Sequence, residues 1–113
     1  DRAQASRCEA LQIFTSAVGQ WRPRVLLDHE AERFRSRIAE AGVTFAVSHA
    51  SYLISIAASD SALRARSADA LGDELDRAER LGLHGVVLHP GAFTSATEAE
   101  GLRRVAGTLA DLL

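Results

Sequence analysis

Three times along the chain a short apolar run is followed by an amphipathic helical pattern, and this alternation constrains the fold more than any other feature. The runs are residues 11–15, 43–48 and 83–88, and each is typical of a buried strand. Parallel strands are joined by right-handed helical crossovers, so successive strands are expected to be neighbours in one sheet. The predicted fold class is therefore α/β.

Capping residues predict where the helices begin and end. Asp28 is expected to cap the first long helix, and Gly42 to end it. Asp60 or Ser59 is expected to cap the second, which ends at Gly82. The apolar stripes predicted to face inward on these two helices are Ala31, Phe34, Ile38 and Ala41, and then Leu63, Leu71, Leu75, Ala78 and Leu81.

The two ends of the chain also show helical patterns. Residues 1–10 are expected to form the last turns of a helix. Thr97, followed three residues later by Glu100, has the spacing of a capping box and predicts the start of a final helix. The side chains expected to face inward on that helix are Leu102, Val105, Ala106 and Leu109.

The number of strands limits the architecture. Three strands make a poor doubly wound sheet and cannot close a barrel. A (β/α)₈ barrel takes about 250 residues. This chain has 113 residues and contains no Met. On length alone, the chain would be a little under half of such a barrel.

Composition excludes several other classes of protein. No apolar run approaches the roughly 20 residues of a membrane-spanning helix. The single cysteine, Cys8, excludes an internal disulfide framework and fits a reducing compartment. The net charge of −2 offers no broad attraction for nucleic acid or for anionic lipid.

Two histidines, His49 and His89, follow successive strands directly. Equivalent positions in successive βα units place both at the carboxyl edge of the sheet, where α/β proteins build their sites. Two imidazoles on neighbouring strand ends can converge on one Zn²⁺ ion, although a catalytic zinc normally needs a third protein ligand. The alternative, in which each is a hydrogen-bonding loop residue, stays open. His29 and His84 are expected to be solvated.

The segments Ala10–Thr15, Gln20-Trp21-Arg22, His49–Ile54 and His89-Pro90-Gly91 together resemble the endonuclease IV family of zinc-dependent apurinic/apyrimidinic endonucleases. With the three predicted strands, the resemblance implies a partial TIM (β/α)₈ barrel, three parallel strands each followed by a helix. The chain would cover the second to fourth βα units. Residues 1–113 would then be a single incomplete domain, lacking the first strand and the C-terminal half of the barrel.

The resemblance also implies a reaction, the hydrolysis of the phosphodiester 5′ to abasic sites in duplex DNA by a multinuclear zinc site. His49 and His89 match two ligands of one ion in a site of up to three Zn²⁺. No catalytic residues beyond metal ligands are implied. The remaining ligands lie outside this chain, so the piece alone is expected to be inactive.

Further matches imply contacts with DNA. Tyr52 and Leu53 match residues that the family inserts at the damaged nucleotide, where an aromatic ring and an apolar wedge can fill a gap in the stack. Without the resemblance, they would be interpreted as a loop packed on the barrel rim. The other matched DNA-contacting residues are Gln20, Trp21 and Arg22. The chain departs from the family pattern at Gly19, where an Arg is common.

Two alternatives are a metal-dependent sugar isomerase/epimerase-like TIM barrel and a non-catalytic remnant that packs against a partner. The wedge-like pair at residues 52–53 and the Gln-Trp pair at 20–21 argue against the isomerase. The endonuclease interpretation implies a monomeric bacterial parent that acts in the cytoplasm on nucleoid DNA, with no membrane association.

Overall fold

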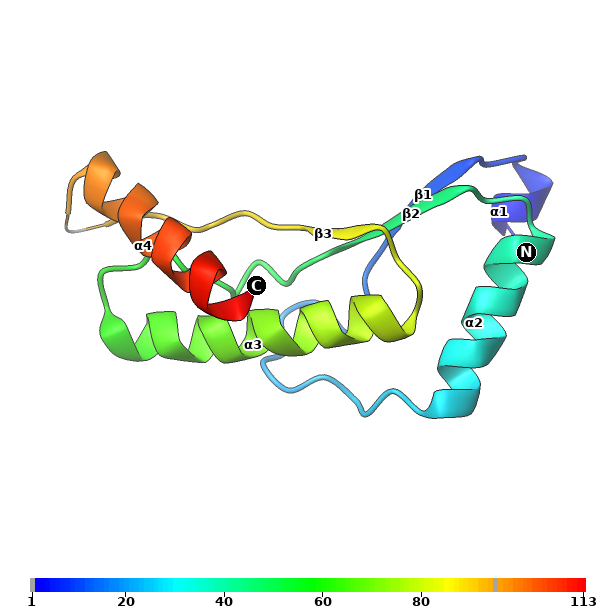
Figure 1. Ribbon diagram of the computed structural model, residues 1–113, viewed down its shortest axis with the longest axis horizontal. Helices are drawn as coiled ribbons and strands as arrows, with labels where there is room; N and C mark the ends of the chain where they lie inside the picture. Colours follow the sequence, from blue (N-terminus) through cyan, green and yellow to red (C-terminus); the bar gives the residue numbers. More distant parts are fainter. Residues whose placement is uncertain (1, 95) are drawn as a thin grey trace.

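The structure is a computed structural model that describes residues 2–94 and 96–113 (Figure 1). Asp1, which falls in the predicted first helix, lies outside the described residues. The elements, in chain order, are α1 (Arg2–Ala5), β1 (Ala10–Ile13), α2 (Asp28–Glu40), β2 (Phe45–His49), α3 (Ser61–Arg80), β3 (Gly85–Val87) and α4 (Glu98–Leu112). The predicted alternation of strands and helices is confirmed, and the first helix is a short one of four residues.

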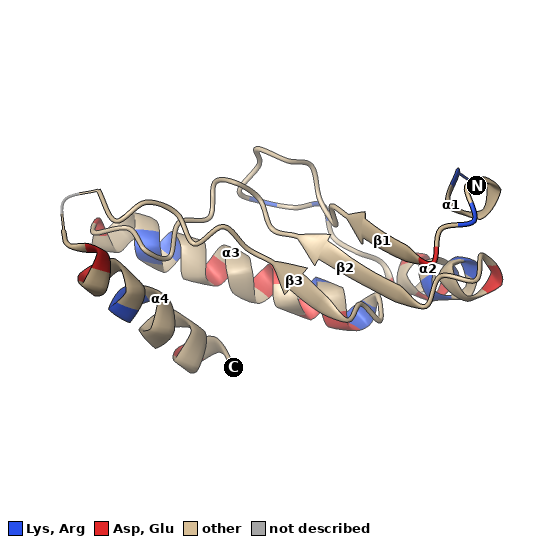
Figure 2. Cartoon of the chain, turned by 90° about the horizontal axis from the view of Figure 1, so that it is seen from above, with Lys and Arg blue, Asp and Glu red and all other residues tan. Residues whose placement is uncertain are grey.

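The strands form one parallel sheet in the order β1-β2-β3. In the register, Ile13 pairs with Ser48 and Ser48 pairs with Val86, so these three side chains share one face. α3 runs along this face (Figures 1 and 2). In the part of the chain that the structure describes, no helix covers the opposite face (Figure 2).

The uncovered face of the sheet carries large apolar side chains. Phe45 is 51% exposed, and Val87 is 40% exposed. In a closed barrel this face becomes the packed interior. The radius of gyration, 15.7 Å, exceeds the roughly 13 Å of a compact domain of this length because the molecule is elongated, measuring 47 × 25 × 24 Å, with α2 and α4 at opposite ends (Figure 1).

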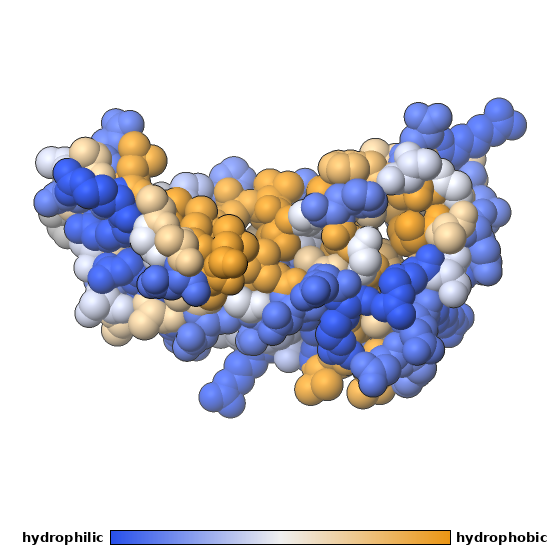
Figure 3. All heavy atoms as spheres, in the orientation of Figure 1, coloured by the Kyte–Doolittle hydropathy of each residue, from blue (hydrophilic) through white to orange (hydrophobic). Residues whose placement is uncertain are grey.

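The core lies between α3, α4 and the carboxyl ends of the strands. Ile56 is fully buried and Leu71 is 2% exposed. Figure 3 shows apolar atoms gathered around the junction of α3, α4 and the sheet. The partly buried residues packed against this core are Ala70, Leu75, Val86, Leu88, Val105, Leu109 and Leu112.

Two of the three predicted helix starts are confirmed, and one is wrong by a residue. The Asp60 carboxylate accepts from the Leu63 N–H at 2.7 Å. Thr97 and Glu100 form the predicted capping box. α2, however, begins at Asp28 with Leu27 as its N-cap. The third helical residue, Glu30, accepts from the Leu27 N–H at 3.0 Å, so one free donor at this end of the helix is satisfied without an Asp cap.

Several burial predictions are wrong. Leu102 is 61% exposed, and Ala106 is also exposed. The reason is that α4 packs on α3 through Val105 and Leu109, which leaves Leu102 and Ala106 facing solvent. Leu63, at the start of α3, is 36% exposed. The first strand is not fully buried as predicted, because alternate residues of β1 face the uncovered side of the sheet and are exposed.

In the described ranges, no helix is long and apolar enough to cross a membrane.

Candidate metal and nucleic-acid site

The two predicted metal-ligating histidines lie side by side at the carboxyl edge of the sheet. His49 is the last residue of β2 and pairs with Val87 of β3. His89 follows two residues after Val87, and the centroids of the two imidazole rings are 5.2 Å apart with the planes inclined by 38°. The sheet register, set by the strand pairing, brings the two side chains together.

The orientation of the His49 ring leaves one nitrogen free for a ligand. Its Nδ1 lies 2.7 Å from the carbonyl oxygen of Ala50, and because a carbonyl only accepts, Nδ1 carries the proton. The lone pair of the neutral ring is then on Nε2. A backbone carbonyl that fixes the tautomer in this way is the usual support for a metal-ligating histidine. The ring of Phe14, 5.6 Å away between centroids, lies against the same imidazole.

The donor set fits one zinc ion in part. Two neutral imidazoles suit zinc, but the described residues hold no group of three or more His, Cys, Asp or Glu side chains that could bind a metal ion. His29 is exposed on α2. His84 is also exposed, as predicted, but its Nδ1 lies 3.2 Å from the Ala46 amide and its ring lies against Phe45. His29 and His84 therefore take no part in the arrangement at residues 49 and 89.

The loop of residues 50–59 carries the predicted wedge next to the histidines. Tyr52 is 70% exposed, whereas Leu53 is half-buried. Burial of apolar side chains holds this loop in place, and the Ala57 N–H donates to the Pro90 carbonyl at 2.9 Å. The apolar residues that fill the space beneath it include Ile54, Ile56 and Ala58.

The rim loop, which we define as residues 16–27, carries the other predicted contacts with DNA. Gln20 and Arg22 are exposed, and Trp21 is half-buried. The guanidinium carbon of Arg66 lies 4.3 Å from the centroid of the Trp21 ring, a cation–π contact.

The two loops meet at Gly19. A Cβ built on Gly19 would lie 3.2 Å from the Tyr52 hydroxyl, and the backbone at Gly19 has φ of +89°, which favours glycine. A side chain at this position would be strained and would crowd Tyr52. The structure thus places all five predicted DNA-contacting residues on two adjacent loops at the edge that also carries the histidines.

One set of residues at this edge is not predicted from the sequence. The Thr15 hydroxyl donates to the Glu74 carboxylate at 2.7 Å and accepts from Nε of Arg77 at 3.1 Å. Glu74 is only 6% exposed. A charged residue on a helix is usually predicted to face solvent, but the position of Glu74 in the sequence indicates burial. Glu74 follows Leu71 by three residues and precedes Ala78 by four, so it falls on the buried stripe of α3.

Residues 1–113 match the family described as xylose isomerase-like TIM barrel, and the chain belongs to that family. Among its relatives are endonuclease IV proteins, so the predicted resemblance and the predicted partial barrel are both confirmed.

The similarity to these relatives is substantial. The chain is 41% identical over 105 residues to the probable endonuclease 4 of Trichlorobacter lovleyi, which covers 93% of this chain and 37% of the relative. It is 44% identical over 99 residues to that of Nitratidesulfovibrio vulgaris, covering 87% and 34%. The crystal structure of endonuclease IV from Thermus thermophilus superposes with a TM-score of 0.81 at 34% identity, covering 98% of this chain and 40% of that one. The chain therefore spans between a third and two-fifths of these three proteins.

Proposed function

We propose that this chain contributes two metal ligands and two DNA-contacting loops to a DNA repair endonuclease. That enzyme hydrolyses the phosphodiester 5′ to abasic sites in duplex DNA. The observation that carries the proposal is the His49–His89 pair, 5.2 Å apart at the carboxyl edge and next to both loops. The endonuclease names of the relatives support the reaction class.

His49 and His89 would hold one zinc ion, His49 through Nε2 because its Nδ1 proton is engaged by Ala50. When bound, zinc supplies Lewis acidity that polarises the phosphate and gives a hydroxide nucleophile near neutral pH. The two imidazoles act as neutral ligands and neither gives nor takes a proton. Further ligands would come from strands that this chain does not contain, so the chain by itself is expected not to cleave DNA.

The loops would recognise the abasic site by shape. Tyr52, with 70% of its surface exposed, is free to enter the space that a missing base leaves in the stack. Leu53 adds an apolar surface beside it. Arg22 is exposed at the same edge and would contact a phosphate, which positions the duplex without reading its sequence.

A hybrid enzyme tests the proposed function. The 113 residues would replace the matching segment of the Thermus thermophilus endonuclease IV, and incision of an abasic-site duplex would be measured with added zinc. The hybrid is expected to cleave. His49→Ala and His89→Ala are each expected to lower the rate by at least about 100-fold. His29→Ala, an exposed histidine on α2, is the matched control and should leave the rate unchanged.

A second measurement does not depend on the hybrid. In the 113-residue chain, titration with zinc would be followed by NMR of the four imidazole rings. Signals of His49 and His89 should move together at the same zinc concentrations, and those of His29 and His84 should not. Zinc shifts confined to His29 or His84, or full activity of the His49→Ala hybrid, would refute the assignment.

A further inference from the structure

The rim loop has almost no backbone support of its own. In the described part of the chain, residues 16–26 make no backbone–backbone hydrogen bonds outside helices and strands. Much of its apolar surface is also exposed, with Val25 at 72% and Leu27 at 46%. Since fixing each residue of a loop costs about 1–2 kcal/mol of conformational entropy, its position must come from other contacts.

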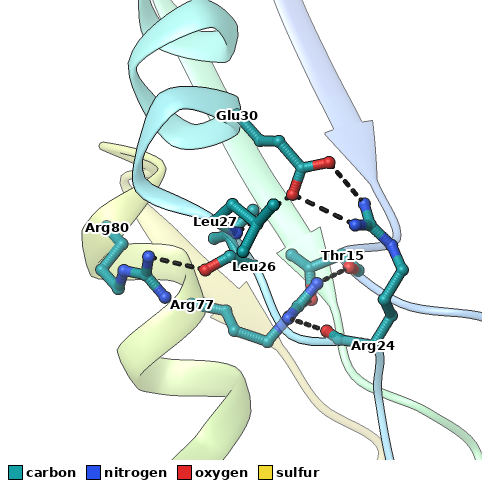
Figure 4. A network of polar contacts seen from close by, with 7 residues as sticks. All are labelled: Thr15, Arg24, Leu26, Leu27, Glu30, Arg77 and Arg80. Carbon is teal, nitrogen blue, oxygen red and sulfur yellow. Dashed lines mark hydrogen bonds and ion pairs between the residues drawn. The ribbon is translucent and has the colours of Figure 1, made fainter.

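Two arginines in the last turn of α3 provide those contacts. Nη1 of Arg77 donates to the Arg24 carbonyl at 2.8 Å, and Nη2 of Arg80 donates to the Leu26 carbonyl at 2.7 Å (Figure 4). Arg77 also donates to the carbonyl of Thr15, at the other end of the loop. The two arginines are three residues apart, which places both on one face of α3. Both ends of the loop are therefore held by one helix turn.

A buried carboxylate orients the first of these arginines. Glu74 accepts from the Thr15 hydroxyl, and that hydroxyl accepts from Nε of Arg77, so one hydroxyl links the carboxylate to the guanidinium. Glu74 is 6% exposed and lies on the stripe of α3 that faces the sheet. Its second oxygen, Oε1, has no hydrogen-bond partner among the described residues. Burying a carboxylate costs free energy, and the Arg77 guanidinium, which the Thr15 hydroxyl links to Glu74, offsets part of that cost.

Arginine suits this task because its planar group has five donors in a fixed fork. Arg77 uses that fork on the Thr15 hydroxyl, the Thr15 carbonyl and the Arg24 carbonyl. A lysine ammonium is a compact point charge on a flexible stem and cannot reach the three acceptors in one geometry. An Arg-to-Lys change at this position keeps the charge and removes the bridge.

We propose that Thr15, Glu74, Arg77 and Arg80 are positioning residues that hold the rim loop across the carboxyl end of β1, so that residues 20–22 face DNA. The part that concerns DNA rests on the proposed function. None of the four is expected to touch the substrate, because each is engaged with the loop or with another member of the set.

Trp21 reports the position of the loop directly, because it is the only tryptophan of the chain. Its exposure in the 113-residue chain can be measured by acrylamide quenching of its fluorescence, with far-UV circular dichroism to show that the fold is kept. Thr15→Val and Arg77→Lys each remove more than one hydrogen bond. Each is expected to raise the open population of the loop by at least about two- to tenfold, the change that loss of a single ordinary hydrogen bond produces. Thr15→Ser keeps the hydroxyl and should restore the wild-type quenching.

Two control variants match the chemistry of these changes away from the loop. Arg103→Lys and Thr108→Val lie on α4 and should leave Trp21 quenching unchanged. Should Thr15→Val fail to fold, Arg80→Lys removes an exposed contact of the same kind and is expected to raise quenching in a folded chain. Wild-type quenching in a folded Thr15→Val, Arg77→Lys and Arg80→Lys would overturn the proposal.

The role in DNA recognition is tested in the hybrid enzyme. Arg77→Lys should raise KM for the abasic duplex and leave kcat close to that of the unmodified hybrid, since only the presentation of the loop changes. Raised quenching with an unchanged KM in an active hybrid would overturn the DNA role and keep the structural one. If the unmodified hybrid does not cleave at all, the proposed function fails, and the Trp21 measurement still decides the positioning of the loop.

Discussion

The two loops that carry the predicted contacts with DNA lie next to each other but differ in how much apolar burial holds them. The loop of residues 50–59 is largely buried, and Ile56 has no exposed surface; Arg64 and Arg104 add hydrogen bonds to the carbonyls of Ala58 and Ala57. The rim loop is held by hydrogen bonds from the side chains of Arg77 and Arg80. Their tips meet where Gly19 approaches Tyr52.

The difference shows that neighbouring parts of one edge can be tuned separately. Apolar burial is non-directional, and its contribution is roughly proportional to the area removed from water. It therefore keeps a loop packed against the core but does not select one orientation. Hydrogen bonds from arginines are directional and exposed to solvent, so they fix orientation while leaving the loop easier to open. Support by burial suits Tyr52 and Leu53, which would enter the DNA. Support by arginine hydrogen bonds suits the rim loop, which would adjust to a substrate.

Truncating one aliphatic side chain in each loop gives the largest expected contrast. Ile56→Ala removes a fully buried side chain and should lower the free energy of unfolding by about 2–5 kcal/mol. Val25→Ala, in the rim loop, removes a side chain that is 72% exposed and should change it by no more than about 0.5 kcal/mol. Urea unfolding of the 113-residue chain measures both, and equal effects would contradict the comparison.

A smaller effect is expected where the turn after His89 touches the loop of residues 50–59. A Cβ on Gly91 would lie 2.8 Å from the Cα of Ser55, and φ at Gly91 is +89°. Gly91→Ala should lower the free energy of unfolding by about 1–3 kcal/mol through backbone strain alone, and the contact between the new Cβ and Ser55 should lower it further. The control is Gly107→Ala in α4, where nothing lies within 4 Å; it should stabilise by about 0.5–1 kcal/mol. Thermal unfolding distinguishes them, and a stable Gly91→Ala chain would argue that the loop yields.

The smallest effect is a dependence on pH confined to the rim loop. The hydrogen bond from Arg24, then that from the Leu27 N–H, holds the pKa of Glu30 below its ordinary value of 4.5. A carboxylate with a lowered pKa stabilises the fold fully above the ordinary value, and this contribution is lost as the pH falls through the lowered one. Trp21 quenching should therefore rise below pH 4.5.

Glu30→Gln is the control for this dependence on pH. The amide cannot ionise, so Trp21 quenching should be raised already at neutral pH and should change less on acidification. Mutation of the other carboxyl with a lowered pKa, Glu100→Gln at the start of α4, should leave the Trp21 profile unaltered. An identical profile in wild type and Glu30→Gln would show that this ion pair does not hold the loop.

Much of the fold follows from local patterns in the sequence. Asp60 and the Thr97–Glu100 pair mark helix starts through bonds that span three residues, and such short spacing is visible in a sequence. The two histidines can be paired because equivalent positions in successive βα units meet at one edge. The prediction for Leu102 is wrong, since periodicity defines a stripe but not its limits, and packing against α3 decides which residues are covered.

The support of the rim loop could not be predicted in the same way. Thr15 and Glu74 are separated by 59 residues and Thr15 and Arg77 by 62, and no local rule joins them. A helix with many charged residues favours a solvated face, and only the three-dimensional arrangement shows that two arginines point at backbone carbonyls. The roles of His49, His89 and the five loop residues in catalysis and DNA binding stay predictions.

The parallel register of the sheet has a consequence for the order in which the molecule assembles. The pairing of β1 with β2 joins Ala10 to Phe45, 35 residues apart, and that of β2 with β3 joins Val47 to Gly85, 38 residues apart. The chain must lose the entropy of closing a long loop before these strand contacts can form. This cost makes parallel sheets slow to fold. The helices between the strands shorten those loops when they form early. We therefore expect the rate at which this sheet forms to depend on α2 and α3, which carry none of the predicted zinc or DNA contacts.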